Sequence, residues 1–121
     1  DGFVDVYTNK KLRIRFDNDT AIVPTFGSIV FATDEKMILG IQREAGGTGN
    51  INVYRDGTYL SPSSQVADSG PITFTAICVR NNDRHVDGHI YEVLFYDTAD
   101  LTTAEIGKIN NYLINKHAPL G

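Results

Sequence analysis

The chain has 121 residues and a net charge of −4, with 41% hydrophobic and 21% charged residues. This is typical of one ordinary globular domain, which buries about two-thirds of the surface that its unfolded chain exposes. The negative charge argues against a general nucleic-acid binder, which is normally basic. Because no stretch approaches about 18 consecutive apolar residues, the sequence predicts no membrane span. We expect a single domain over residues 1–121, and the first residue, Asp1, indicates a piece of a longer or processed chain.

Short alternating segments fill the first part of the chain. Phe3–Tyr7 is a predicted strand, and Lys11–Phe16 alternates strictly between apolar and basic residues, which also predicts a strand. Further strands are predicted over residues 21–23, 27–33 and 36–43, with turn residues between them.

The basic residues of the second predicted strand form a row on one face: Lys11, Arg13 and Arg15. Such a row suits contact with an acidic partner. Basic residues on an outer strand also discourage edge-to-edge aggregation, which is the alternative interpretation.

A hairpin is predicted in the middle of the chain. Asn50–Arg55 and Thr58–Leu60 flank the dipeptide Asp56-Gly57, which favours a two-residue turn of the primed type. A polar loop follows, and Pro71–Arg80 is the next predicted strand. Its Cys78 has no partner for an internal disulfide, and we interpret it as a small buried hydrophobic residue.

The C-terminal stretch carries the strongest signals. Gly88–Tyr96 is apolar on both faces, which is typical of a strand covered on both sides, and we expect Pro71–Arg80 to lie beside it. Thr102-x-x-Glu105 then forms a capping box, which predicts the start of a helix that ends before Pro119 and docks on the preceding strand. The helix has an apolar face of Ile106, Ile109 and Leu113, flanked by Tyr112 and Ile114, and a polar face of Lys108, Asn111 and Asn115.

These motifs resemble those of a known family. They read Gly88-x-Ile90-x-Glu92-Val93-x-x-Tyr96-Asp97, then Leu101-x-x-x-Glu105-Ile106, then Tyr112-Leu113. The pattern resembles the C-terminal signature of concanavalin A-like lectin/glucanase domains, with the laminin G-like jelly-roll branch nearest. Tyr54-x-Asp56-Gly57 is similar to a hairpin motif of that family, so the resemblance covers about residues 50–121. It implies an all-β fold: a two-sheet antiparallel jelly-roll sandwich with one C-terminal helix.

The resemblance also implies a function, that of a non-catalytic, lectin-like module for binding or adhesion. Such a module recognises glycan or protein at an exterior surface. The alternative is a structural role as a decoration, capsid or tail domain of a virion or other large assembly, where neighbouring protein subunits are the partners. Either role places the chain on the exterior of a virion or of an extracellular assembly.

Catalysis is not expected. Glucanase members of the family carry the pattern E-x-D-x-x-E on one strand, so that one carboxylate attacks while another donates a proton. This chain has only Glu92 on the corresponding strand. We interpret Glu92 as a structural acid that pairs with a nearby cation or backbone N–H group.

The loop from Arg80 to His85 carries guanidinium and amide groups that suit sugar hydroxyls or acidic partners. Tyrosines elsewhere in the chain offer aromatic surfaces on which sugars stack. The candidate ligand-binding residues are Tyr54, Tyr59, Arg80, Asn81, Asn82, Asp83, Arg84 and His85. The alternative is that the loop is an ordinary solvated turn.

Calcium is the one cofactor that the resemblance raises, because many relatives hold this ion on the rim of the sandwich. The candidate ligands are Asp17, Asp19, Asp83 and Asp87, whose carboxylates are the hard oxygen ligands that calcium prefers. The alternative is that these residues form hydrogen-bonded Asx turns without an ion. The histidines lack the spacing of a zinc site, and no other cofactor is expected.

Overall fold

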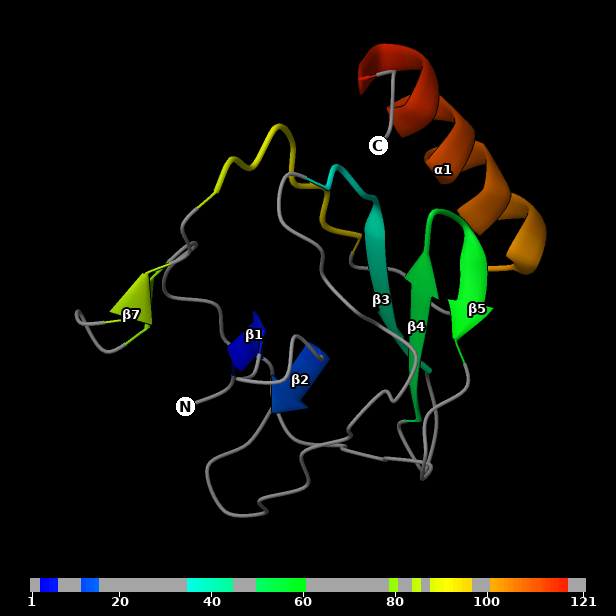
Figure 1. Ribbon diagram of the computed structural model, residues 1–121. Coiled ribbons are helices and arrows are strands. Elements are labelled where there is room, and N and C mark those ends of the chain that lie inside the picture. Colours follow the sequence, from blue (N-terminus) through cyan, green and yellow to red (C-terminus); the bar gives the residue numbers. More distant parts are fainter. Residues whose placement is uncertain are drawn as a thin grey trace.

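The computed structural model describes residues 3–6, 12–15, 35–44, 50–60, 79–80, 84–85, 88–96 and 101–117, with side chains in 35–44, 50–60, 88–96 and 101–117. Its elements are β1 (Phe3–Val6), β2 (Leu12–Arg15), β3 (Leu39–Arg43), β4 (Ile51–Arg55), β5 (Thr58–Leu60), β6 (Val79–Arg80), β7 (Arg84–His85) and α1 (Thr103–His117) (Figure 1). No helix in these stretches is long and apolar enough to cross a membrane.

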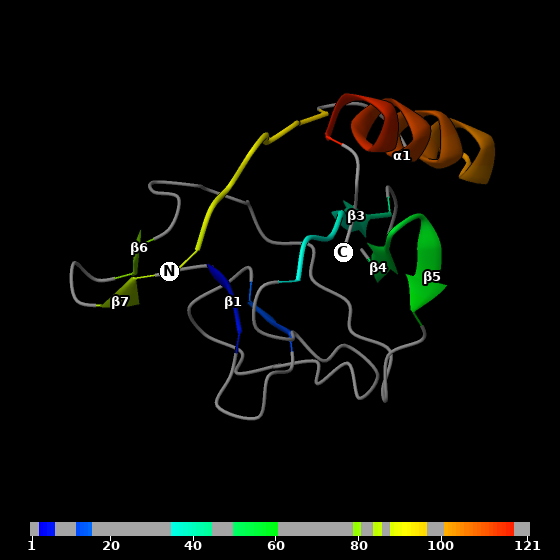
Figure 2. The same cartoon turned by 45° about the horizontal axis from the view of Figure 1, so that its top comes forward.

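The described strands form three separate antiparallel sheets. β1 pairs with β2, β6 pairs with β7, and β3, β4 and β5 form a three-stranded sheet with β4 in the middle. α1 lies as a separate layer over the three-stranded sheet (Figure 2). The side chain of Gln42 in β3 connects the two layers, because its Nε2 donates a hydrogen bond of 2.9 Å to the carbonyl oxygen of Leu101, just before α1.

The buried core of the described part lies on the central strand β4. Ile51 and Val53 are 2% and 0% exposed. Val53 lies opposite Ile41 of β3 and Leu60 of β5, and residues opposite each other share a face of the sheet. Because side chains alternate along a strand, Tyr54 points to the other face, towards α1. Burying each of the two core side chains contributes roughly 1.5–3 kcal/mol.

The predicted hairpin is confirmed. Asp56 and Gly57 connect β4 to β5 with φ angles of 49° and 81°, the left-handed values that a primed two-residue turn requires. The turn is also tied to the residue before β3. The Asp56 amide donates to the carbonyl oxygen of Ile38 over 2.9 Å, and the Ile38 amide donates to Oδ1 of Asp56 over 2.8 Å.

The predicted helix and its capping box are confirmed as well. The backbone amide of Thr102 donates to Oε2 of Glu105 over 2.8 Å, and the Glu105 amide donates to Oγ1 of Thr102 over 3.3 Å. Two backbone N–H groups at the helix start thus have partners. The Thr102 hydrogen bonds lower the pKa of Glu105 below its usual value, because they favour the charged carboxylate.

The expected two-sheet jelly-roll sandwich is wrong. The described part has a three-stranded antiparallel sheet and one helix, and the pairs β1–β2 and β6–β7 do not join that sheet. The expectation depended on Gly88–Tyr96 as a central strand. In the structure these residues, which we name the 88–96 segment, are extended but pair with no described strand. An apolar run shows that a segment can be covered on both faces, but it does not specify which strand would pair with it.

The expected neighbour of this segment also pairs elsewhere. Within the predicted strand Pro71–Arg80, the described residues Val79 and Arg80 form β6, which pairs with Arg84–His85 in a tight hairpin. α1 likewise docks on the three-stranded sheet and meets the 88–96 segment mainly at its C-terminal turn. A hairpin between neighbouring residues has a small entropic cost of loop closure, so it competes well with a pairing between more distant residues.

The turn glycine offers a direct test of this packing. A Cβ atom at Gly57 would lie 2.7 Å from Nδ2 of Asn110 in α1, and its φ of +81° is unfavourable for any side chain. We expect Gly57→Ala to lower the free energy of unfolding by about 1–2 kcal/mol in urea denaturation. The control is Gly107→Ala, whose Cβ would meet nothing within 4 Å and which should stabilise α1 by about 0.5–1 kcal/mol. Equal effects of the two substitutions would contradict the turn geometry.

The capping box gives a second test. Thr102→Ala removes the hydroxyl that accepts from the Glu105 amide and should lower the free energy of unfolding by about 1 kcal/mol. Thr103→Ala, one residue further on, is the matched control and should be neutral or slightly stabilising, because alanine has the higher helix propensity. Urea denaturation of both variants checks this, and a similar loss in the two would contradict the assignment of Thr102 as the cap.

Candidate functional site

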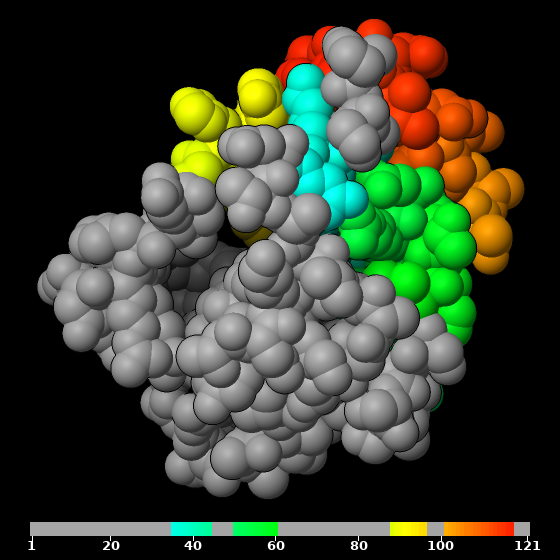
Figure 3. Space-filling model, viewed as in Figure 1, coloured from blue at the N-terminus to red at the C-terminus, as the bar shows by residue number. Residues whose placement is uncertain are grey.

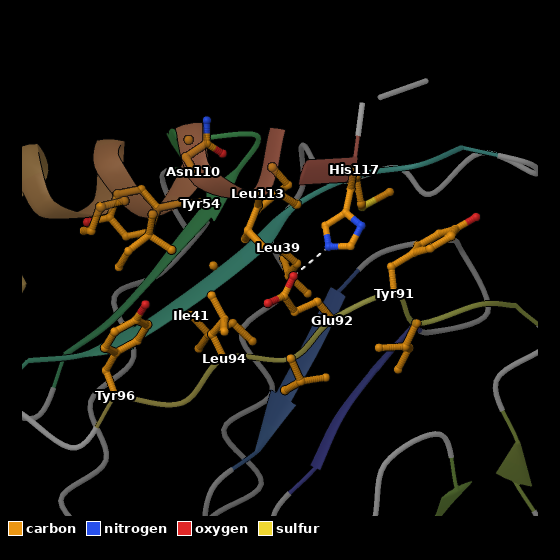
Figure 4. A pocket seen from close by; sticks show the side chains of 18 of the residues that line it. Leu39, Ile41, Tyr54, Tyr91, Glu92, Leu94, Tyr96, Asn110, Leu113 and His117 are labelled. Carbon is orange, nitrogen blue, oxygen red and sulfur yellow. Dashed lines mark hydrogen bonds and ion pairs between the residues drawn. The ribbon is translucent and has the colours of Figure 1, made fainter. Parts of the chain in front are cut away.

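Three segments that are far apart in the sequence surround a cavity of about 400 Å³. They are residues 36–42, which contain most of β3, the 88–96 segment and the apolar face of α1, and they meet on one side of the molecule (Figure 3). The apolar lining includes Leu39 and Ile41 of β3, Ile90, Val93 and Leu94 of the 88–96 segment, and Ile106, Ile109 and Leu113 of α1. Figure 4 shows the side chains converging on the cavity from these elements.

The spacing of apolar residues in α1 explains why the helix faces the cavity. Ile106, Ile109 and Leu113 recur every three or four residues, so they lie on one side of the helix. All three are half-buried and line the cavity. The predicted polar face, consisting of Lys108, Asn111 and Asn115, is exposed.

Glu92 joins the 88–96 segment to the C-terminal turn of α1. Its Oε2 lies 2.6 Å from Nε2 of His117 (Figure 4), and its Oε1 accepts hydrogen bonds from the Tyr112 hydroxyl over 3.1 Å and from Nζ of Lys116 over 3.2 Å. Lys116 also donates to the Tyr112 hydroxyl over 2.9 Å. The expectation that Glu92 is a structural acid paired with a cation agrees with these contacts.

The same contacts shift the pKa values of the ionisable groups. The hydrogen bond with His117, and then those from Lys116 and Tyr112, lower the pKa of Glu92 below its ordinary value of 4.5. The hydrogen bonds of Lys116 to Tyr112 and to Glu92 raise the pKa of that lysine. Both groups therefore stay charged over a wide range around neutral pH.

Lys36 closes the same end of the cavity from the other side. Its Nζ donates a hydrogen bond of 2.7 Å to the carbonyl oxygen of His117, near the end of α1. The same Nζ lies 4.5 Å from the centre of the Tyr91 ring, which is a cation–π contact. Lys36 thus connects the chain before β3 with both the helix end and the 88–96 segment.

The other end of the cavity is formed by α1, β4 and the β4–β5 turn. Tyr54 donates a hydrogen bond of 3.4 Å from its hydroxyl to Oε1 of Gln42, and its partial burial raises its pKa. Asn110 of α1 packs against Gly57, and its Oδ1 is buried without a hydrogen-bond partner among the described residues. Figure 4 labels both Asn110 and Tyr54 among the side chains that line the cavity.

The volume of the cavity has an energetic consequence. At about 24 cal/mol per Å³, a sealed void of this size would cost on the order of 10 kcal/mol. That is comparable to the whole stability of a typical domain, which is about 5–15 kcal/mol. The pocket is open to solvent on part of its surface, so this cost does not apply to it, and its volume is space that water or a ligand can occupy.

The described residues that line the cavity are mostly apolar and aromatic. Among the described residues around the cavity there is no serine, threonine or cysteine, so no hydroxyl or thiol nucleophile of these types stands beside the Glu92–His117 pair. No group of three or more His, Cys, Asp or Glu side chains within the described part could hold a metal ion.

The structure brings together only some of the candidate ligand-binding residues. Tyr54 and Tyr59 lie on adjacent strands with their ring centres 5.7 Å apart in an edge-to-face contact. Arg80 lies opposite Arg84 across β6 and β7, and His85 lies opposite Val79. The β6–β7 hairpin and the β4–β5 hairpin lie on opposite sides of the molecule in both ribbon views (Figures 1 and 2). Asn81, Asn82 and Asp83 are outside the described residues.

The remaining candidates concern partner contact and calcium. Arg13 and Arg15 are in β2, where they lie opposite Asp5 and Phe3 of β1, so they share a face of that strand. Lys11 and the four calcium candidates, which are Asp17, Asp19, Asp83 and Asp87, are outside the described residues. Contact with an acidic partner and calcium binding stay predictions.

Sequence reasoning missed the roles of three residues that shape the site. Lys36 and Asn110 were not identified at all, and His117 was not identified as the partner of Glu92. The contact between Lys36 and His117 joins residues that are 81 positions apart, and no local pattern indicates it. Asn110 stands at the border of the apolar stripe of α1, and a polar residue in that place was the one available signal.

No family model, no curated protein and no solved structure matches the chain.

The Glu92 contacts predict a pH dependence. Glu92→Gln should lower the thermal midpoint near neutral pH, because the amide cannot form the ion pair with Lys116. Since the folded state depresses the pKa of Glu92, the carboxylate stabilises the fold fully above its unfolded pKa, which is near 4.5, and this contribution is lost as the pH falls through the lower folded pKa. The difference in midpoint between the two proteins should thus shrink in acid.

The control for this titration is Lys108→Met, on the exposed face of the same helix. When Lys108→Met is present in both proteins, the difference in thermal midpoint between the protein with Glu92 and the Glu92→Gln variant should be unchanged at every pH. A difference in midpoint that stays constant from neutral pH to pH values well below the ordinary pKa would contradict the role of the Glu92 carboxylate.

Proposed function

We propose that the chain is a non-catalytic binding module that attaches to a protein partner through the 88–96 segment, as part of a larger assembly at an exterior surface. One observation carries the proposal: the run of large apolar side chains on this segment is exposed. Ile90, Tyr91, Val93, Leu94, Phe95 and Tyr96 are between 38% and 65% exposed.

The area of this run favours a binding surface. Half-exposed side chains of this size together leave on the order of 500 Å² of apolar surface in contact with water. Contiguous patches of that size on soluble monomers often have a function, most commonly in binding a protein or another ligand. Apolar and aromatic residues are also the usual central residues of protein–protein interfaces.

The backbone of the same region favours a partner with an extended chain. Residues 88–94 pair with no described strand, so their N–H and C=O groups are available for a ladder. β3 is the edge of the described three-stranded sheet. The backbone groups of Ile38, before β3, and of Glu44, after it, form hydrogen bonds on the β4 side. Because the direction of these groups alternates along a strand, the backbone N–H and C=O groups of Leu39 and Ile41 point away from β4. Proteins commonly recognise extended peptides by adding a strand at such an edge.

Glycan recognition is the second candidate, and it rests on the tyrosine pair of the β4–β5 hairpin. Tyr59 is 47% exposed and contacts the ring of Tyr54, which holds it in place. An exposed, fixed aromatic ring is a surface on which a sugar can stack. This role agrees with the lectin-like function that the sequence motifs imply.

The two candidates predict different results for the purified chain. In selection from a displayed peptide library, we expect enrichment of peptides with alternating apolar residues, and Val93→Lys should abolish their binding. Tyr59→Lys, an equally exposed apolar residue on the far hairpin, is the matched control and should bind these peptides as the wild type does. Unchanged thermal midpoints would show that both variants are folded.

A glycan array, run with and without calcium, tests the glycan-binding candidate. Sugar binding that Tyr59→Lys abolishes and Val93→Lys leaves intact, together with a peptide selection that enriches nothing, would overturn the protein-binding proposal in favour of glycan recognition.

A further inference from the structure

The exposed run of the 88–96 segment is complementary to itself. When two copies of the segment lie antiparallel with their Val93 residues opposite each other, Ile90 lies opposite Tyr96 and Tyr91 lies opposite Phe95. Aromatic–aromatic and aromatic–β-branched pairs of this kind stabilise antiparallel strands. These five residues are between 42% and 65% exposed, so each has surface that such a pair would cover.

The sequence of the run also selects the register of such a pair. Opposite residues in an antiparallel pair share a face, so a symmetric pair is centred on one residue that faces its own copy. A centre at Glu92 would place two carboxylates opposite each other, which is destabilising. Centres at Tyr91 and Leu94 would place Phe95 and Tyr91, respectively, opposite an aspartate of the flanking sequence. A centre at Val93 avoids all three conflicts.

The charged groups that contact the run already have partners in the same chain. The side chain of Glu92 is only 17% exposed and is bonded to Lys116 and His117. Lys36, whose Nζ lies over the Tyr91 ring, donates to the carbonyl oxygen of His117. Since residues at the centre of an interface are mainly apolar and aromatic, the run needs apolar contact from a partner and not a compensating charge.

The available area and the backbone suit a dimer. If each copy contributes on the order of 500 Å² of exposed apolar surface, two copies bury about 1,000 Å², which is the lower limit of a specific protein–protein interface. Residues 88–94 pair with no described strand, so the N–H and C=O groups of Glu92 and Leu94 are available for a ladder with a second copy. Figure 2 shows the segment as a long arc at the periphery of the molecule.

We propose that the protein partner of the 88–96 segment is a second copy of this chain, which pairs with it antiparallel about a two-fold axis at Val93. This inference rests on the protein-binding role of the segment and names its partner. Such an isologous contact covers the exposed run of both copies at once, so the assembly closes at a dimer.

Sedimentation velocity of the full chain over a range of concentrations tests the self-association. We expect the average mass to rise towards twice that of one chain. Val93→Lys and Val93→Glu should each weaken the association by about a hundredfold or more, because each places like charges opposite one another in the interface. Tyr59→Lys, an exposed residue on the far hairpin, is the matched control and should associate as the wild type does.

A mixture of the two Val93 variants tests the two-fold axis. Each variant alone should be monomeric, whereas an equimolar mixture should form a heterodimer, since a positive charge then faces a negative one across the axis. Contact of Val93 with a different surface of the second copy would give no such recovery. A recovered heterodimer also shows that both variants are folded.

Three results would overturn the inference: a wild-type chain that stays monomeric at every concentration, a Val93 variant that associates as the wild type does, or a mixture that associates no better than its components. The peptide selection separates this failure from that of the protein-binding proposal. A monomeric chain that still binds the selected peptides contradicts only the second copy as the partner, whereas a monomeric chain that binds no peptide contradicts both.

Discussion

The contact between Glu92 and the last turn of α1 is the constraint on which the rest of the site depends. The 88–96 segment has no ladder hydrogen bonds to a described strand, so its position relative to the helix is set by side chains. Glu92 receives two hydrogen bonds and a close contact from His117, all from residues within a turn and a half of α1. Charge-assisted hydrogen bonds of this kind are stronger than neutral ones, and several of them on one carboxylate give it a single preferred position.

This polar attachment also explains why a cavity exists next to so many apolar side chains. Apolar residues of α1, β3 and the 88–96 segment would gain most by packing directly against each other. The contacts of Glu92 and Lys36 fix the helix end and the segment at one point. The Gln42–Leu101 hydrogen bond connects the helix start to β3. With both ends of α1 attached, the middle of its apolar face, Ile109 and Leu113, is left facing a space that neither neighbour fills.

The features that the sequence predicted correctly are those that a few neighbouring residues determine. The Asp56-Gly57 turn needs two residues with positive φ, and the capping box needs a threonine and a glutamate three positions apart, so both can be identified from the local sequence. The predicted strands Phe3–Tyr7 and Lys11–Phe16 likewise correspond to β1 and β2, whereas their pairing and register come from the structure alone.

The incorrect part concerns how distant segments pair. The apolar composition of Gly88–Tyr96 predicts a central strand, but composition carries no information about register or partner. In the structure Glu92, the one carboxylate in the run, connects it to Tyr112, Lys116 and His117 of α1. The contacts of Asn110 with Gly57 and of Lys36 with His117 depend on how the layers meet, and neither residue type nor spacing reveals them.

The exposed run and the cavity share residues, and this has a consequence for binding. Ile90, Val93 and Leu94 are partly exposed to solvent and also line the cavity, so one extended segment separates the two. Because the segment is attached mainly through Glu92 and Lys36, a strand that pairs with its backbone would change how closely its side chains approach α1.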